Sequence, residues 1–99
     1  MEVKKSDLLS ADFKVAAEIY EYNYVKKENV WFNRLVKSLG AKGGPSKATI
    51  AKSLNALFDW GIIKGEYGET EKGNAGRLLF VTNENKGLIR DIYEKYWKQ

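Results

Sequence analysis

The stretch from Ser46 to Trp60 concentrates hydrogen-bonding side chains on one face of a predicted helix. On a helix that advances about 100° per residue, its apolar residues fall on one side and its polar and small residues on the other. The apolar side contains Ile50, Leu54, Leu57 and Phe58, and the opposite side contains Ala48, Lys52, Asn55 and Asp59. Asn55 can pair with adenine, Lys52 can donate to guanine or to phosphate, and Ala48 can touch a thymine methyl group. This pattern predicts a helix face that contacts the major groove of a duplex.

The beginning of the same stretch is suited to binding phosphate. Ser46 can cap the helix, and Lys47 and Thr49 add a cation and a hydroxyl beside the free backbone N–H groups of the first turn. We therefore assign Ser46, Lys47 and Thr49 to positioning on a phosphate backbone, without a role in reading bases. The structural alternative is that Ser46 only caps, Thr49 packs against the first turn, and Lys52 and Asn55 face solvent.

Positive charge is concentrated around these residues. The chain has 17 Lys and Arg against 13 Asp and Glu, a net charge of +4. The segment 34–58 contains five basic residues and no Asp or Glu, while both flanks are nearly neutral. The five are Arg34, Lys37, Lys42, Lys47 and Lys52. Such a one-sided stretch is typical of a polyanion-binding surface, although a solubilising face is the alternative. Arg34 and Lys37 are interpreted either as flanking phosphate contacts or as plain surface charges.

The residue types on which most small enzymes depend are missing. The chain contains no Cys and no His, which excludes disulfides, thiolate and imidazole metal ligands, a Cys nucleophile and an imidazole base. The segment GAKGGPSK at 40–47 looks like a phosphate-binding loop but lacks the Gly-Lys-Ser/Thr ending. We expect no enzyme activity, no cofactor and no metal.

Length and hydropathy bound the remaining classes. We expect the 99 residues to form one domain spanning 1–99, with the aromatic side chains supplying much of its core. No run approaches the roughly 18 apolar residues of a membrane helix, and the first residues lack the apolar stretch of a signal peptide. These features predict a cytoplasmic protein without a membrane partner.

Three helices are predicted in the first 60 residues. The first follows Ser10 or Asp12, and its end among the tyrosines at 20–24 is not defined. After a possible minimal strand at 30–32, Asn33 is predicted to cap a short helix that stops at Gly40. A turn at 40–45 then leads to Ser46 and the third helix.

A β-hairpin and a last helix are predicted to follow. The strand-like segments IIKGEY at 62–67 and RLLFVT at 77–82 flank a loop. Lys72 and Arg77 in this hairpin can lie along a minor groove or a phosphate backbone, although nearby glutamates dilute their charge. Thr82 or Asn83 is predicted to begin the last helix, which has a wide apolar stripe. The stripe consists of Leu88, Ile89, Ile92, Tyr93, Tyr96 and Trp97.

This order of elements is that of a winged helix-turn-helix domain, an α+β fold that is mostly α. The segment 46–63, SKATIAKSLNALFDWGII, resembles the recognition helix of winged-helix transcriptional regulators of the MarR, PadR and related groups. The shared features are the Ser-Lys-x-Thr start, the pair Leu54 and Leu57, and the ending at Gly61 before two branched residues. The segment 77–87 is similar to their second wing strand and the start of their last helix. The turn at 40–45 is longer than is usual in this motif.

The resemblance, which covers residues 30 to about 92, implies a function and a partner. It implies sequence-specific binding of double-stranded DNA by a transcriptional regulator, with the helix from Ser46 to Trp60 in the major groove. It also implies a homodimer through the N- and C-terminal helices, whose aromatic side chains suit a subunit interface. The alternatives are a winged-helix protein-protein interaction module without DNA binding, and aromatics that simply complete a monomer core. RNA ranks below duplex DNA because the aromatics fall on helical stripes.

Overall fold

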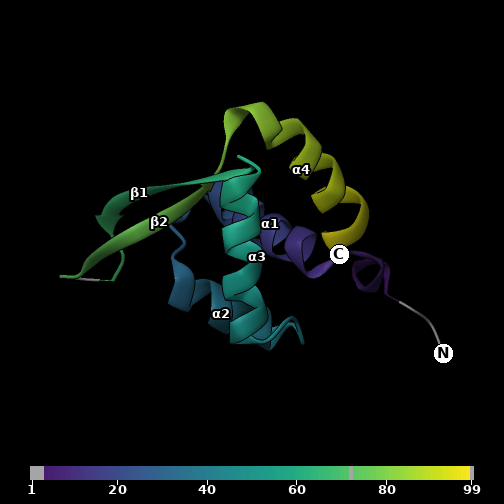
Figure 1. Ribbon diagram of the computed structural model, residues 1–99, viewed down its shortest axis with the longest axis horizontal. Coiled ribbons are helices and arrows are strands. Elements are labelled where there is room, and N and C mark those ends of the chain that lie inside the picture. The colour runs from purple at the N-terminus through teal and green to yellow at the C-terminus, as the bar shows by residue number, and fades with distance from the viewer. Residues whose placement is uncertain (1–3, 72, 99) are drawn as a thin grey trace.

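The computed structural model describes residues 4–71 and 73–98 (Figure 1). Its main elements are α1 (Ala11–Tyr20), α2 (Phe32–Ala41), α3 (Lys47–Asp59), β1 (Ile63–Glu69), β2 (Ala75–Val81) and α4 (Lys86–Ile92). Short 3-10 turns, η1 (Lys5–Leu8) and η3 (Asn83–Asn85), precede α1 and α4, and π-helical turns, η2 (Glu21–Lys26) and η4 (Tyr93–Trp97), extend them. This is the predicted order of three helices, a hairpin and a C-terminal helix.

The central helix α1 begins where a local signal predicted it. The Ser10 hydroxyl accepts a hydrogen bond from the backbone N–H of Phe13, so Ser10 caps the helix and Asp12 lies inside its first turn. The helical path continues through the tyrosines as η2 and ends at Lys27, whose φ is +55°. Tyr24 donates to the carbonyl oxygen of Val81 at 3.2 Å, which ties η2 to the hairpin.

The start of α2 differs from the prediction. Trp31 occupies the N-cap position, so Asn33 lies within the first turn and caps nothing. No strand forms at 30–32 in the described chain, although the carbonyl oxygen of Val30 accepts from the N–H of Leu79 at 2.9 Å. This long-range contact attaches the start of α2 to β2.

The turn between α2 and α3 closes tightly despite its length. Gly43 has a left-handed backbone, with φ +71°. The N–H of Gly44 donates to the carbonyl oxygen of Leu39 at 2.8 Å, and a Cβ at Gly44 would lie 2.9 Å from that oxygen. Glycine is therefore required at position 44 to bring the two helices together. As predicted, the Ser46 hydroxyl caps α3 by accepting from the N–H of Thr49 at 3.3 Å.

The core lies where α1 meets the other helices. In Figure 1, α3 crosses in front of α1, and α4, which also packs against α1, lies at the upper right. The hairpin projects to the left as a wing. The side chains with no exposed surface include Val15, Ile19, Val30, Leu35, Leu39, Ile50, Leu57 and Ile89. The strands pair antiparallel, with Ile63 opposite Val81 and Tyr67 opposite Arg77.

None of the described helices combines the length and apolar character needed to cross a bilayer.

The last helix begins later than predicted: Thr82 precedes the 3-10 turn η3 without a side-chain cap, and α4 begins at Lys86. Its apolar stripe is mostly used within the chain. Ile89 and Tyr93 are buried, while Ile92 and Trp97 pack against the core. Leu88 is 50% exposed. The stripe therefore serves mainly to complete the core of this chain. This arrangement favours the monomer-core alternative over the predicted subunit interface.

Candidate nucleic-acid interface

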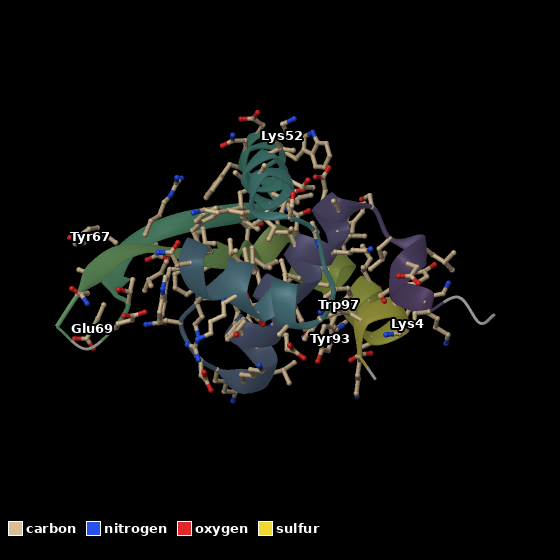
Figure 2. The ribbon with its side chains drawn as sticks, turned by 90° about the horizontal axis from the view of Figure 1, so that it is seen from below. Lys4, Lys52, Tyr67, Glu69, Tyr93 and Trp97 are labelled. Carbon is tan, nitrogen blue, oxygen red and sulfur yellow. The ribbon has the colours of Figure 1, made fainter. Side chains whose placement is uncertain are left out.

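The two faces of α3 divide as the helical pattern predicted. Ile50, Leu54 and Leu57 are buried. The exposed side chains are Lys47, Ala48, Lys52, Asn55 and Asp59. Figure 2 shows Lys52 on the outer side of α3, pointing away from the rest of the molecule. The helix therefore presents a continuous polar face to solvent. Its single carboxylate lies in the last turn.

The beginning of α3 carries donors suited to an anion. The Ser46 hydroxyl donates to Thr49 Oγ1 at 3.1 Å while it caps the helix, so it is used within the chain. The Thr49 hydroxyl and the exposed Lys47 ammonium remain as donors beside the first-turn N–H groups. Lys47 Nζ lies 5.9 Å from the ring centroid of Phe32, which places the start of α3 beside the start of α2.

Two of the five basic residues in the acid-free segment are paired internally. The Arg34 guanidinium donates to the carbonyl oxygen of Asn29 at 2.7 Å and forms an ion pair with Glu28. It also lies over the rings of Tyr22 and Trp31, at 4.8 and 5.3 Å. These contacts favour a structural role for Arg34, and its contact with phosphate stays a prediction.

Lys42 is the second cation used internally. Its Nζ lies 2.6 Å from Glu18 Oε1 and 2.9 Å from Glu21 Oε2. By contrast, the exposed Lys37, Lys47 and Lys52 form no ion pair within the part of the chain that the structure describes. The free positive charge of the segment is therefore confined to α2 and the outer face of α3.

Arg77 brings the wing into contact with α3. Its guanidinium carbon lies 4.0 Å from the ring centroid of Phe58, and the side chain is exposed. Lys64, on β1, pairs instead with Glu66 at 3.2 Å. Lys72 lies outside the described residues, so its predicted role is untested.

Tyr67 is a wing residue that the sequence analysis missed. Its side chain is 83% exposed, and it lies opposite Arg77 in the strand register, so both side chains project from the same face of the hairpin. Strand periodicity alone does not fix this register, because a one-residue shift would move Tyr67 to the other face.

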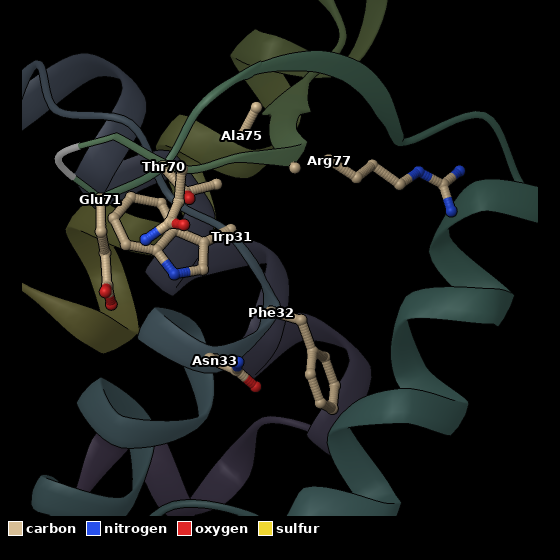
Figure 3. Close-up of a pocket in the computed structure, with 9 residues that line it drawn as sticks. Trp31, Phe32, Asn33, Thr70, Glu71, Ala75 and Arg77 are labelled. Carbon is tan, nitrogen blue, oxygen red and sulfur yellow. The ribbon is translucent and has the colours of Figure 1, made fainter.

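A cleft of about 500 Å³ separates the start of α2 from the wing (Figure 3). Trp31, Phe32 and Asn33 line one side, and wing residues between 70 and 77 line the other. The sequence analysis also missed this cleft. The only local signal was the aromatic pair Trp31 and Phe32 in the possible strand at 30–32, and such a pair is more typical of core packing.

A buried carboxylate holds the helix-turn-helix against the C-terminal turn. Glu18 has no exposed surface and accepts from Ser38, from Lys42 Nζ and, at 2.9 Å, from the indole N–H of Trp97. Burial raises the pKa of the Glu18 carboxyl, but the hydrogen bonds from Lys42, Ser38 and Trp97 and the charge of Lys42 together lower it below its ordinary value. All its oxygens have partners, so the arrangement is structural.

Glu21 extends this network to η4. It accepts from the Tyr93 hydroxyl at 3.1 Å as well as from Lys42. Burial, followed by the negative charge of Glu21, raises the pKa of Tyr93 to about 12. No cluster of three or more potential metal ligands occurs among residues 4–71 and 73–98.

Comparison with known proteins gives structural matches alone. No protein-family model matches the chain, and no curated protein matches it. The circadian clock-associated protein Pex from Anabaena matches with a TM-score of 0.66 and 17% identity, over 87% of this chain and 76% of that one. Pex from Synechococcus sp. (strain PCC 7942) matches with a TM-score of 0.63 and 18% identity, over 92% and 85%.

A third matching structure comes from one of the groups that the sequence resembles. A PadR-family transcriptional regulator from Eggerthella lenta DSM 2243 matches with a TM-score of 0.59 and 19% identity, over 84% of this chain and 68% of that one. The chain has a PadR-like winged-helix fold. At these identities the likeness establishes the fold, and function has to be argued from the site.

Proposed function

We propose that this chain binds double-stranded DNA as a transcriptional regulator, with α3 in the major groove. The observation that carries the proposal is the exposed face of α3, where Ala48, Lys52 and Asn55 lie opposite the buried stripe and Lys47 is exposed in the first turn. Similarity in fold to a PadR-family transcriptional regulator supports it. The protein acts by binding, without catalysis, in the cytoplasm where its DNA is accessible.

The proposed interface divides into reading and positioning contacts. Asn55 and Lys52 contact base edges, and the small Ala48 lets the helix approach closely. Lys47 and Thr49 bind phosphate beside the N–H groups of the first turn, which Ser46 holds in place.

Flanking contacts come from α2 and the wing. Lys37 is exposed on α2 and Arg77 on β2, and both supply cations to the proposed interface. The role of Lys72 stays a prediction from the sequence. We leave Arg34 out of the interface because Glu28 and Asn29 already hold its guanidinium. Its contacts fix the segment before α2, which positions the aromatic pair beside the cleft.

A salt series separates the two kinds of contact. Duplexes enriched from a random pool would be labelled, and binding measured by fluorescence anisotropy for the wild type, Lys47→Ala and Asn55→Ala. Lys47→Ala should weaken binding to every sequence and reduce the salt slope by about one unit. Asn55→Ala should leave the slope unchanged and cost about 1 to 3 kcal/mol at one position of the site.

Lys5→Ala is the matched control, since Lys5 is an exposed lysine in η1, which packs against η4. It removes the same charge and should change binding little. If the wild type enriches no duplex, the proposal is wrong and the interaction module becomes the better account. If Lys47→Ala behaves like Lys5→Ala, the assigned surface is wrong.

A homodimer through the terminal helices is the second part of the proposal. The apolar surface available to it includes Leu8 in η1, 70% exposed, and Leu88 in α4, 50% exposed. Association there would place two copies of α3 about 34 Å apart for a palindromic site. Light scattering at micromolar concentration should give twice 11.3 kDa, and an 11.3 kDa species alone would remove the dimer.

A further inference from the structure

A side chain of the wing, Arg77, contacts α3. Figure 3 shows Arg77 extending from β2 toward α3. The guanidinium carbon reaches 4.0 Å from the ring centroid of Phe58, which lies in the last turns of α3 and is half-buried against the core. A guanidinium over an aromatic ring is held by cation–π attraction. The contact therefore connects two elements that otherwise meet mainly at the base of the hairpin.

Gly65 provides the space for this contact. A Cβ at Gly65 would lie 2.3 Å from Arg77 Nε, 3.0 Å from its Cγ and 3.1 Å from its Cδ. The glycine lies on β1, diagonally across from Arg77 in the strand register. Its φ is not positive, so the backbone would accept a side chain at this position. The three nearest atoms that a Cβ at Gly65 would meet all belong to the Arg77 side chain.

The held guanidinium keeps its hydrogen-bonding capacity. Stacking on a ring uses the face of the planar group and leaves its in-plane N–H donors free for a phosphate. Arg77 is exposed and has no ion pair within residues 4–71 and 73–98. Fixing this long side chain before binding removes part of the entropic cost of ordering it in a complex.

We propose that Phe58 and Gly65 are positioning residues that hold Arg77 ready to bind a DNA phosphate at the junction of the wing and α3. This inference rests on the proposed function. It adds that binding by the wing depends on two uncharged residues, neither of which needs to touch DNA.

Gly65→Ala tests the proposal without removing charge. The added methyl group displaces Arg77, and affinity for duplex DNA should fall by about threefold to tenfold. Arg77→Ala should weaken binding at least as much and lower the salt slope by about one unit. In the Arg77→Ala background, Gly65→Ala should cause no further loss, because the glycine acts only through Arg77.

The glycine control is Gly87→Ala, at a position in α4 where a Cβ meets nothing within 4 Å. It should bind DNA like the wild type. If Gly65→Ala also binds like the wild type while Arg77→Ala is weaker, the positioning role is overturned. Additive losses in the double variant would overturn it as well.

A measurement on the free protein separates this inference from the proposed function. The Phe58 ring current should displace the NMR resonance of the Arg77 Nε–H, and Phe58→Leu and Gly65→Ala should each abolish the displacement. An ordinary resonance position in the wild type would overturn the contact, whatever the protein binds. A displaced resonance in a protein that binds no duplex would overturn the proposed function and the phosphate contact while leaving the Arg77–Phe58 contact established.

Discussion

A basic residue contributes to a binding surface only when its own chain leaves it free. The acid-free segment suggested five equivalent cations, but Arg34 and Lys42 are held by glutamates from neighbouring segments. Lys52 escapes this pairing because it points outward from α3 (Figure 2), and Lys47 because it lies beside Phe32 at the start of α2. Counting charges along the sequence therefore overestimated the free positive charge of this segment.

The buried Glu18 should be the most sensitive polar residue for stability. Glu18→Gln keeps the size of the side chain but removes the charge that Lys42, Ser38 and Trp97 recognise. Hydrogen bonds to charged groups contribute about 1.5 to 3 kcal/mol each, so the free energy of unfolding should fall by about 2 kcal/mol. Urea titration measures the change, with the exposed Glu84→Gln as control. Equal stability of the two variants would show that the network contributes little.

The same network gives stability an acid limit. Because the pKa of the folded Glu18 carboxyl is below its ordinary 4.5, unfolding takes up a proton at low pH. Its contribution is therefore complete above pH 4.5 and is lost as the pH falls through the folded pKa. Free energies of unfolding measured between pH 2 and 6 should show this loss. Each unit by which folding lowers the pKa of Glu18 corresponds to roughly 1.4 kcal/mol of stability. Glu18→Gln should flatten the acid limb, and an unchanged limb would contradict the assignment.

An alkaline limit follows from Tyr93. Its folded pKa of about 12 exceeds the ordinary 10, so the neutral phenol is favoured by folding. The contribution is complete below pH 10 and is lost as the pH rises toward 12. Tyr93→Phe should reduce the fall in stability across this window, as measured by urea titration at fixed pH. An identical alkaline profile in the variant would contradict the account.

At the scale of elements, the start of a helix was predicted correctly where a capping residue determines it. The Ser46 hydroxyl satisfies an N–H three residues away, so the start of α3 was predictable from nearby residues. The start of α2 was not, because Val30 is held by Leu79 and the helix begins at Phe32, ahead of the better capping residue Asn33. A distant strand overrode the local preference there.

Substitutions at Ser46 can separate its capping role from binding. Ser46→Ala should lower the free energy of unfolding by about 1 kcal/mol because α3 loses its cap. Ser46→Asp should keep the cap and its stability, since a carboxylate is favourable at a helix N-terminus. The same negative charge should weaken DNA binding, because it lies where a phosphate is proposed.

Thermal unfolding and anisotropy, measured on both variants, distinguish the two effects. Ser46→Asp should be as stable as the wild type and yet bind less tightly. Undiminished DNA binding by this variant would mean that no phosphate approaches the start of α3.

At the scale of the molecule, the candidate interface combines α2, α3 and the wing, which follow one another along the chain. The outer face of α3 was predictable because one helical period determines it. The cleft between α2 and the wing, and the contact of Arg77 with Phe58, depend on the strand register and on where the hairpin projects (Figure 1). Such long-range geometry leaves no local pattern, which is why Trp31 and Tyr67 were missed.

The most direct test of the central claim is an NMR titration of the labelled protein with an enriched duplex. We predict that the largest backbone amide shifts fall between Ser46 and Asn55 and at Arg77. The amides of two exposed lysines in the terminal turns, Lys5 in η1 and Lys95 in η4, should change little. Shifts that concentrate on α1, η1 or α4 while the amides of α3 stay in place would contradict the account.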